Sequence, residues 1–314
     1  MRNIGFFLLI LLTTQILFAQ EPEQGKNEIS SSSELVLQAS TMPGLKLGFT
    51  ERFYFPFLQG ESALTKDNNI SLALTGEIAP ISLNGTVEAV WTPIAFFQLT
   101  AGGRLGSGWI LDLSGKQSYG IGLIKADANG KVEHSGKAFD GLLWKAQAGA
   151  VLQADLAAVI PGDWNHAVAR TYHEINYRGY TAASKGESWS YEDDNGYPGE
   201  NCNGFNYYNN FLLGYQMPIF LNMAALIAEA DLYLYDTPDR SKWGDDLIRW
   251  TFGLLLNFSI TKKIEIAVLT QFWTRRNFLE PDWQDLYYRY RTLDKSNPVR
   301  LEFFRVAAAL TMKL

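Results

Sequence analysis

The sequence of 314 residues predicts an all-β protein: a transmembrane antiparallel up-and-down β-barrel of ten strands, with twelve strands as the alternative. Three observations predict this fold. Apolar and polar residues alternate over many segments, as they do in a strand with one apolar and one polar face. The connections between these segments are alternately long and short, which is typical of outer-membrane barrels. The last segment keeps its alternation to the final residue, as a strand must if it pairs with the first strand and leaves no open edge.

A secreted β-sandwich or β-solenoid also shows alternation, so this soluble alternative has to be weighed. Several segments here place an apolar face opposite a charged face for six or seven pairs without a break, which favours the barrel. In the segment SLNGTVEAVW (82–91), for example, Leu83 and Val87 share one face, and Asn84 and Glu88 share the other. We therefore expect Leu83 and Val87 to face lipid, and Asn84 and Glu88 to face the lumen.

Residues 1–19 have the composition of a cleaved secretory signal peptide. Arg2 gives a positive start, residues 5–18 are mostly apolar, and Ala19 is a small residue before the expected cut. An uncleaved membrane anchor is the alternative, but the apolar run is too short and too interrupted for a span of about 20 residues. Residues 20–33 show no periodicity and are expected to be a flexible lead-in.

The barrel is expected over residues 34–314 and begins with a long strand at about 34–55, whose alternation keeps its phase through Pro43. A second long strand is expected at about 70–91, where the phase slips by one residue at Pro80. A β-bulge and a very tight turn both produce such a slip, and we favour the bulge. Hairpins at both prolines would raise the count from ten strands to twelve and keep it even.

Eight further strands follow the same alternation. They are expected at about 97–109, 144–156, 166–182, 211–217, 226–234, 248–258, 264–272 and 304–314. The long connections lie near 56–69, 114–140, 183–204, 236–246 and 277–298, and the short ones near 93, 161–165, 218–221 and 260–263. With both chain ends on the periplasmic side, the long connections face the outside.

Ten polar residues at alternating positions are predicted to line the lumen. They are Glu88, Arg104, Lys145, Gln147, Asp155, Glu229, Asp231, Arg249, Glu265 and Arg305. Charges of both signs can line a polar path for a solute. They can also close the lumen as a set of salt bridges, because an unpaired buried charge is costly. Ten strands leave a nearly filled lumen, whereas wide aqueous channels appear at roughly 16–18 strands, so a general-diffusion porin is not expected. A narrow, selective pore is compatible with this size, and twelve strands would make it easier.

Five stretches at turns and strand ends resemble those of spirochaetal, treponema-type outer-membrane β-barrel proteins. They are WTPIAF (91–96), IPGDWNH (160–166), LGYQMP (213–218), YLYDTPDRSKWGDD (233–246) and LEFFRV (301–306). The resemblance covers roughly residues 70–314 and implies an outer-membrane location and a barrel fold. It implies no catalytic residue, because members of this family are mostly described only as outer-membrane proteins.

No catalytic, metal or cofactor site is predicted. The three histidines, His134, His166 and His173, lie in a loop, at a short turn and within a strand, with no Asp-x-His pair of the omptin type. A barrel hydrolase is the least favoured hypothesis. It would be strengthened if His173 faced the lumen beside a Ser or Asp at the outer rim. The acid-rich loop at 183–204 could hold calcium, but its spacing fits no EF-hand, so a solvated loop is expected. Cys202, in the same loop, is expected to be a free thiol.

The net charge of −6 argues against nucleic acid as a partner. Expected partners are outer-membrane lipid, the barrel-assembly machinery during biogenesis, and either a small solute or an extracellular ligand. The sequence favours a narrow pore or transporter for small solutes in the cell outer membrane. The alternative is a structural or ligand-binding surface barrel with a plugged lumen.

Overall fold

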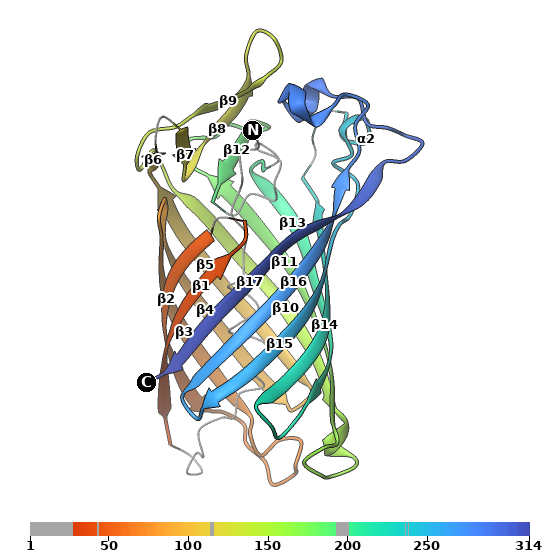
Figure 1. The fold of residues 1–314 in the computed structure, drawn as a ribbon. Helices are drawn as coiled ribbons and strands as arrows, with labels where there is room; N and C mark the ends of the chain where they lie inside the picture. The colour runs from red at the N-terminus through yellow and green to blue at the C-terminus, as the bar shows by residue number, and fades with distance from the viewer. Residues whose placement is uncertain (1–27, 43, 114–115, 193–200, 236, 238) are drawn as a thin grey trace.

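The computed structural model describes residues 28–42, 44–113, 116–192, 201–235, 237 and 239–314. Within them, twelve antiparallel strands form one closed barrel (Figure 1). The ring closes at a seam between the first and last strands, where seven residue pairs run from Glu34 opposite Lys313 to Ser40 opposite Ala307. The prediction of an all-β, antiparallel up-and-down barrel is therefore confirmed.

The barrel strands are β1 (Ser30–Ser40), β2 (Gly44–Pro56), β3 (Asn69–Ala79), β4 (Ser82–Ile94), β5 (Phe97–Gly108), β10 (Leu143–Asp155), β11 (His166–Tyr180), β13 (Gly204–Gln216), β14 (Leu221–Tyr233), β15 (Arg249–Thr261), β16 (Ile264–Arg276) and β17 (Val299–Lys313). Residues 30–33, predicted to belong to the lead-in, pair with β2 and are the first residues of the barrel. The predicted signal peptide at 1–19 lies outside the described residues. In the described part of the chain, no helix is long and apolar enough to span a membrane.

The main prediction of ten strands was wrong, and the alternative of twelve is confirmed. The long strand expected at 34–55 is a hairpin of β1 and β2, in which Ser40 pairs with Gly44. Paired residues share a face of the sheet, and in this register the two residue numbers of each pair add up to an even sum. Even-numbered residues therefore face the lumen in both strands. The alternation passes through the turn without a change of phase, so the sequence pattern hides the hairpin.

The phase slip at Pro80 marks a second hairpin. Pro80 and Ile81 form a tight turn between β3 and β4, and Ala79 pairs with Ser82. The residue numbers of each pair here add up to an odd sum, so the lumen-facing phase changes by one residue at the turn. A two-residue hairpin and a β-bulge thus leave the same mark on the sequence, and the favoured interpretation as a bulge was wrong.

The two additional hairpins change which connections lie at each end of the barrel. We call the end that carries Lys313 the inner end, and the opposite end the outer end (bottom and top of Figure 1). The connection at 57–68 lies at the inner end, although it was predicted to lie with the other long connections. The remaining long connections, 109–142, 181–203, 234–248 and 277–298, all lie at the outer end.

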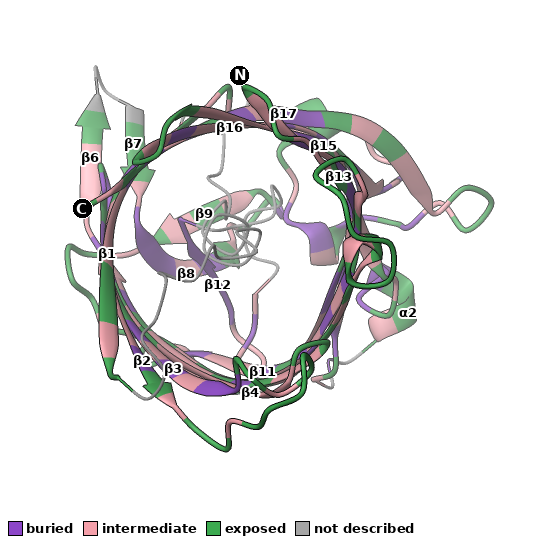
Figure 2. Ribbon diagram, turned by 90° about the horizontal axis from the view of Figure 1, so that it is seen from below, coloured by how far each residue is buried: buried purple, intermediate pink, exposed green. Residues whose placement is uncertain are grey.

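These four outer connections pack together, and we call their described residues the cap. The short elements of the cap are β6 (Ile110–Leu113), β7 (Lys116–Tyr119), β8 (Ile121–Ala126), β9 (Val132–Ser135), β12 (Ser188–Tyr191), α2 (Arg240–Trp243), η2 (Asp282–Gln284) and η3 (Tyr288–Tyr290), whereas η1 (Leu156–Ala158) lies at the inner end. Strands β12, β8 and β9 form one small sheet from two different connections. A buried cluster that includes Ile124, Trp243 and Tyr288 joins three connections. Seen from the inner end, β8, β9 and β12 lie across the mouth of the barrel (Figure 2).

The outer wall of the barrel is apolar all the way round. Large apolar side chains are exposed on every barrel strand, among them Leu37, Leu47, Leu74, Leu83, Leu105, Leu152, Ile175, Leu213, Leu226, Leu254, Phe272 and Phe303. Val87 is exposed as predicted, and Asn84 on the opposite face is buried. The sequence pattern therefore assigned the two faces of the wall correctly.

On the side of the barrel that includes β13 to β17, the lumen face changes from charged to apolar toward the inner end. In β14, the lumen-facing Asp231 and Glu229 are followed toward the inner end by Ile227, Ala225 and Met223. The side chains on this part of the wall form one buried apolar cluster: Val36, Val168, Leu212, Met223, Ala225, Ile227, Leu255, Leu269, Ala307 and Ala309. On this side, a solute that enters from the outer end would therefore meet charged side chains first and apolar side chains afterwards.

Candidate functional site in the barrel lumen

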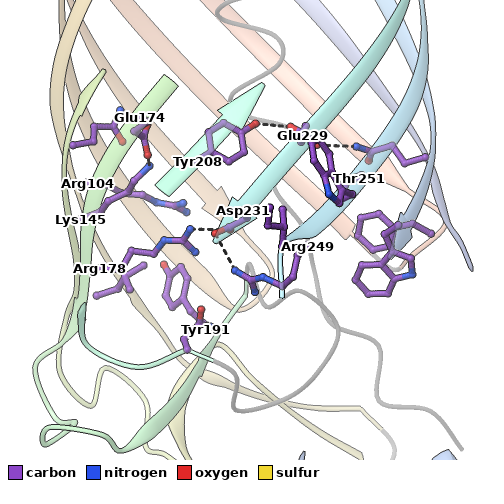
Figure 3. Close-up of a pocket in the computed structure, with 18 of the residues that line it drawn as sticks. Arg104, Lys145, Glu174, Arg178, Tyr191, Tyr208, Glu229, Asp231, Arg249 and Thr251 are labelled. Carbon is purple, nitrogen blue, oxygen red and sulfur yellow. Dashed lines mark hydrogen bonds and ion pairs between the residues drawn. The ribbon is translucent and has the colours of Figure 1, made fainter. Parts of the chain in front are cut away.

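A cavity of about 200 Å³ lies in the lumen toward the outer end (Figure 3). Eight of the ten residues predicted to face the lumen line it: Glu88, Arg104, Lys145, Gln147, Glu229, Asp231, Arg249 and Arg305. They come from strands on all sides of the ring. That these residues form a path for a solute stays a prediction.

The other two predicted residues, Asp155 and Glu265, lie at the inner end. Asp155 is the last residue of β10, and its carboxylate lies 2.7 Å from His166 Nδ1. Glu265 lies 2.7 Å from Lys313 Nζ and accepts a hydrogen bond from Asn257 at 3.2 Å. Both carboxylates are engaged locally and do not line the cavity.

Asp231 holds two arginines together at the centre of the cavity wall. Its carboxylate oxygens lie 3.0 Å from Arg178 Nη2 and 3.0 Å from Arg249 Nη2 (Figure 3). Arg178 comes from β11 and Asp231 from β14, so this ion pair bridges over β13, which lies between them in the sheet. Arg249 also lies over the Tyr233 ring, with its guanidinium carbon 3.9 Å from the ring centre. One carboxylate thus serves two cations.

Glu174 and Lys145 form a second buried pair, with Lys145 Nζ 2.6 Å from Glu174 Oε1. The carboxylate of Glu174 also accepts hydrogen bonds of 2.7 Å from the Tyr172 hydroxyl and 2.7 Å from the Asn176 amide. Burial of a carboxylate is tolerated here because each oxygen has a donor.

Glu229 lies in a third group, on β14 two residues from Asp231. It accepts hydrogen bonds from the Tyr208 hydroxyl at 2.6 Å and from Gln271 Nε2 at 3.3 Å. Gln271 in turn accepts a 2.7 Å hydrogen bond from Arg305 Nε. The chain of contacts links β13, β14, β16 and β17 through side chains alone.

An irregularity in the pairing of β16 and β17 gives this wall an aromatic stack. The register shifts after Gln271, so Phe304 and Arg305 are both buried. The Phe304 ring stacks on Trp273 with 4.1 Å between centres, and the guanidinium of Arg305 lies 4.7 Å from the Phe304 ring centre. Stacking of this kind restrains a guanidinium while leaving its edge free for hydrogen bonds.

Sequence reasoning missed Glu174, Arg178 and Tyr208, which also line the cavity. The segment at 166–182 looked irregular because polar residues occupy both of its faces. Its even positions carry the lumen charges, and this signal was present in the sequence. Tyr208 fell outside the strand predicted at 211–217, whereas β13 begins at Gly204.

The cap reaches the barrel wall through Glu192, whose carboxylate is fully buried. It lies 3.1 Å from Lys46 Nζ and 3.3 Å from Arg104 Nη2, and it accepts a 2.7 Å hydrogen bond from Asn84 Nδ2. The Ser82 hydroxyl donates a further hydrogen bond to it. The prediction of a solvated acidic loop was therefore wrong for Glu192.

The remaining acidic residues of that loop give no metal site in the described chain. Glu187 accepts a hydrogen bond from the Ser184 amide and lies 3.4 Å from Lys125 Nζ. Residues 193–200, which hold Asp193, Asp194 and Glu200, lie outside the described residues. Among the side chains that the structure describes, no group of three or more His, Cys, Asp and Glu could hold a metal ion.

The histidines are not arranged as a hydrolase would require in the described structure. His134 stacks on Tyr119 in the cap, and His166 pairs with Asp155 at the inner end. His173 occupies an odd position of β11 and so faces away from the lumen, 2.7 Å from the Tyr207 hydroxyl. That the protein is not an enzyme stays a prediction.

Cys202 is a free, buried thiol in the cap, with Sγ 3.3 Å from Arg289 Nη2. Burial raises the pKa of this thiol, and the nearby guanidinium only partly offsets the effect. A raised pKa means less thiolate at a given pH. We therefore expect slow alkylation of native protein near neutral pH, with a rate that still climbs above the ordinary thiol pKa of about 8.5.

Iodoacetamide labelling over a range of pH, on native and on denatured protein, measures this directly. The denatured chain supplies the matched control, because its only thiol is the same one. Equal rates in the two states would contradict a packed cap.

No model of a known protein family matches the chain, and no curated protein matches it. Among solved structures, the KdgM porin is 10% identical with a TM-score of 0.35, covering 91% of this chain and 99% of that one. The beta domain of the Bordetella autotransporter BrkA is 10% identical with a TM-score of 0.40, with the same coverage. Salmonella typhi OmpF in complex with daunomycin is 6% identical with a TM-score of 0.28, covering 92% and 98%. The assignment of a barrel therefore depends on the strand pairing of this chain itself.

Proposed function

We propose that this chain is an outer-membrane β-barrel protein that conducts small polar solutes through a narrow lumen. The membrane part of the proposal is supported by the exposed apolar side chains on every barrel strand, such as Leu226 and Leu254. An apolar surface that continues round the whole molecule is not expected in water. A closed ring also satisfies its backbone hydrogen bonds internally, as a lipid environment requires.

The observation that carries the pore proposal is the cavity inside the closed ring, lined by charged and amide side chains from strands on every side. Twelve strands leave a lumen much narrower than a wide porin has. The cap at the outer end and the buried apolar cluster toward the inner end further restrict which solutes can pass. Only small solutes that can exchange water for these side chains would pass.

A closed barrel that binds a ligand at its outer surface is the second candidate. It is favoured by the ion pairs of the lumen, because Asp231 and Glu192 each hold two cations from separate strands. Such ion pairs restrain the side chains of the lumen and lower the net charge that a passing solute would meet. In this candidate the cap, not the cavity, would make the functional contacts.

Current measurements in planar lipid bilayers separate the two candidates. We expect steady, small openings from the purified protein and a clear change of conductance and ion preference in Arg249→Gln, because a lumen charge acts on every passing ion. Leu226→Met, on the lipid-facing wall, is the matched control and should leave the current unchanged. Silent membranes from both the wild-type protein and a cap variant, Glu192→Gln, would contradict the pore and favour the closed barrel.

The proposal includes the remaining expectations from the sequence. The predicted signal peptide at 1–19 would direct export, and the barrel-assembly machinery would insert the chain into the outer membrane. Membership of the treponema-type barrel family, with no enzymatic activity, is part of the same proposal. It is supported by the five stretches that resemble this family.

A further inference from the structure

The contacts of Glu192 describe a complete binding site for an oxyanion. Four donors converge on its carboxylate: the Lys46 ammonium, the Arg104 guanidinium, the Ser82 hydroxyl and the Asn84 amide. All four donors belong to the barrel wall, on β2, β4 and β5, whereas the carboxylate belongs to the cap. The wall therefore holds the site, and the cap supplies its present occupant.

The donors are fixed in place by contacts of their own. Asn84 accepts hydrogen bonds through Oδ1 from Arg104 Nε at 3.0 Å and from the Tyr191 hydroxyl at 2.7 Å. These two bonds orient the amide so that its nitrogen points to Glu192. Ser82 and Asn84 are 0% and 3% exposed. Tyr191 belongs to β12 of the cap, whereas Arg104 belongs to the wall and keeps its bond to Asn84 when the cap moves. The amide is therefore partly ordered before an anion binds, which lowers the cost in conformational entropy.

We propose that Lys46, Ser82, Asn84 and Arg104 form an oxyanion site in the lumen wall. In this proposal the cap narrows the lumen by seating Glu192 in the site, and a small carboxylate or phosphate solute widens the lumen by taking the place of Glu192. The proposal names the solute class and the regulation of the proposed pore, and in that respect rests on the pore function. The anion site itself does not depend on it.

Two features of the lumen agree with an anionic solute. Two cations, Lys46 and Arg104, lie beside the Glu192 carboxylate, and such a pair of positive charges attracts an incoming anion. In the same cavity, Asp231 is likewise shared by two arginines. The lumen wall thus binds a carboxylate with a pair of cations at two separate places.

The binding step is tested with the full chain in detergent and with acetate or inorganic phosphate as the probe. Glu192→Ala leaves the four donors without their occupant, so ¹³C-acetate titrations followed by NMR are expected to show binding on the order of tenfold tighter than in the wild-type protein. Adding Arg104→Gln to this variant should abolish the gain. Equal affinity in the wild-type protein and Glu192→Ala would overturn the site. Parallel titration with phosphate identifies the preferred head group.

The matched control is Glu187→Ala, which removes a more exposed carboxylate from the same connection without touching the wall. It should bind acetate as the wild-type protein does. Heat-modifiable migration on gels establishes that each variant is a folded barrel. Glu192→Gln, which keeps the size of the side chain and removes its charge, replaces the alanine variant if that variant does not fold.

The opening step has its own readout in Cys202, the single thiol of the chain, which is buried in the cap. Acetate should speed Cys202 alkylation in the wild-type protein relative to chloride at equal ionic strength. In the Glu192→Ala variant, Cys202 alkylation should be fast even without acetate. In the Glu187→Ala variant, it should stay slow. Acetate binding with no change in Cys202 would overturn the release of the cap. Silent bilayers combined with tight acetate binding would contradict the pore and still support the site.

Discussion

Replacing Asp231 by asparagine is expected to destabilise the barrel by about 3–5 kcal/mol, the usual cost of removing one partner from a buried ion pair. Arg178 and Arg249 both lie 3.0 Å from this carboxylate, and all three side chains are mostly buried. Without it, two guanidiniums face each other in a space that excludes most water, and the repulsion is weakly screened. The midpoint of urea unfolding in lipid vesicles, followed by gel migration of the folded form, measures the loss.

The control for this prediction is Asp155→Asn. It breaks the contact with His166 at the inner end, where both side chains are partly exposed. Solvent screening keeps such pairs at about 1 kcal/mol or less. Losses of equal size in the two variants would mean that the lumen excludes no more water than the inner rim does, and the site would need another explanation.

Replacing Leu226 by arginine is expected to cost about 2–4 kcal/mol and to lower the yield of folded barrel on refolding into vesicles. Leu226 is 62% exposed near the middle of β14, between the lumen-facing Ala225 and Ile227. In water, the same change at an exposed position would alter stability by about 0.5 kcal/mol or less. The large expected cost comes from moving a charge into hydrocarbon.

A matched substitution, Leu64→Arg, separates these explanations. Leu64 is also exposed, but it lies in the inner-end connection at 57–68, beyond the barrel wall. We expect Leu64→Arg to fold and unfold like the wild-type protein. If Leu226→Arg behaved in the same way, the outer wall would not be in contact with lipid, and the membrane proposal would be wrong.

The sequence was enough to predict which residues face outward and which face the lumen, but it was not enough to predict the number of strands. Alternation places Leu83 outside and Asn84 inside whatever the strand count is, because the side chains of any strand alternate. A hairpin in even register, such as Ser40 opposite Gly44, preserves the phase of the alternation. Only turn chemistry could reveal it, and Pro43 with Gly44 was that signal.

The candidate site could be predicted as a set of residues but not as a set of partners. Eight lumen residues followed from their positions in single strands. That Arg178 meets Asp231 depends on the relative stagger of β11, β13 and β14, which no local pattern determines. The insertion of Glu192 depends on the packing of four separate connections, whose polar sequence looks like that of any solvated loop.

The seam between β1 and β17 has a mechanical consequence. It has seven residue pairs, whereas β16 accompanies β17 from Ile264 opposite Met312 to Arg276 opposite Val299. Among the described strands, residues 299–305 of β17 thus pair with β16 alone, and Val306 is also hydrogen-bonded to Thr41 next to the seam. The first and last strands of the barrel meet there, so the barrel closes along its shortest strand pairing. We expect the pairing of β1 with β17 to open first under heat or force, and its amide protons to exchange soonest.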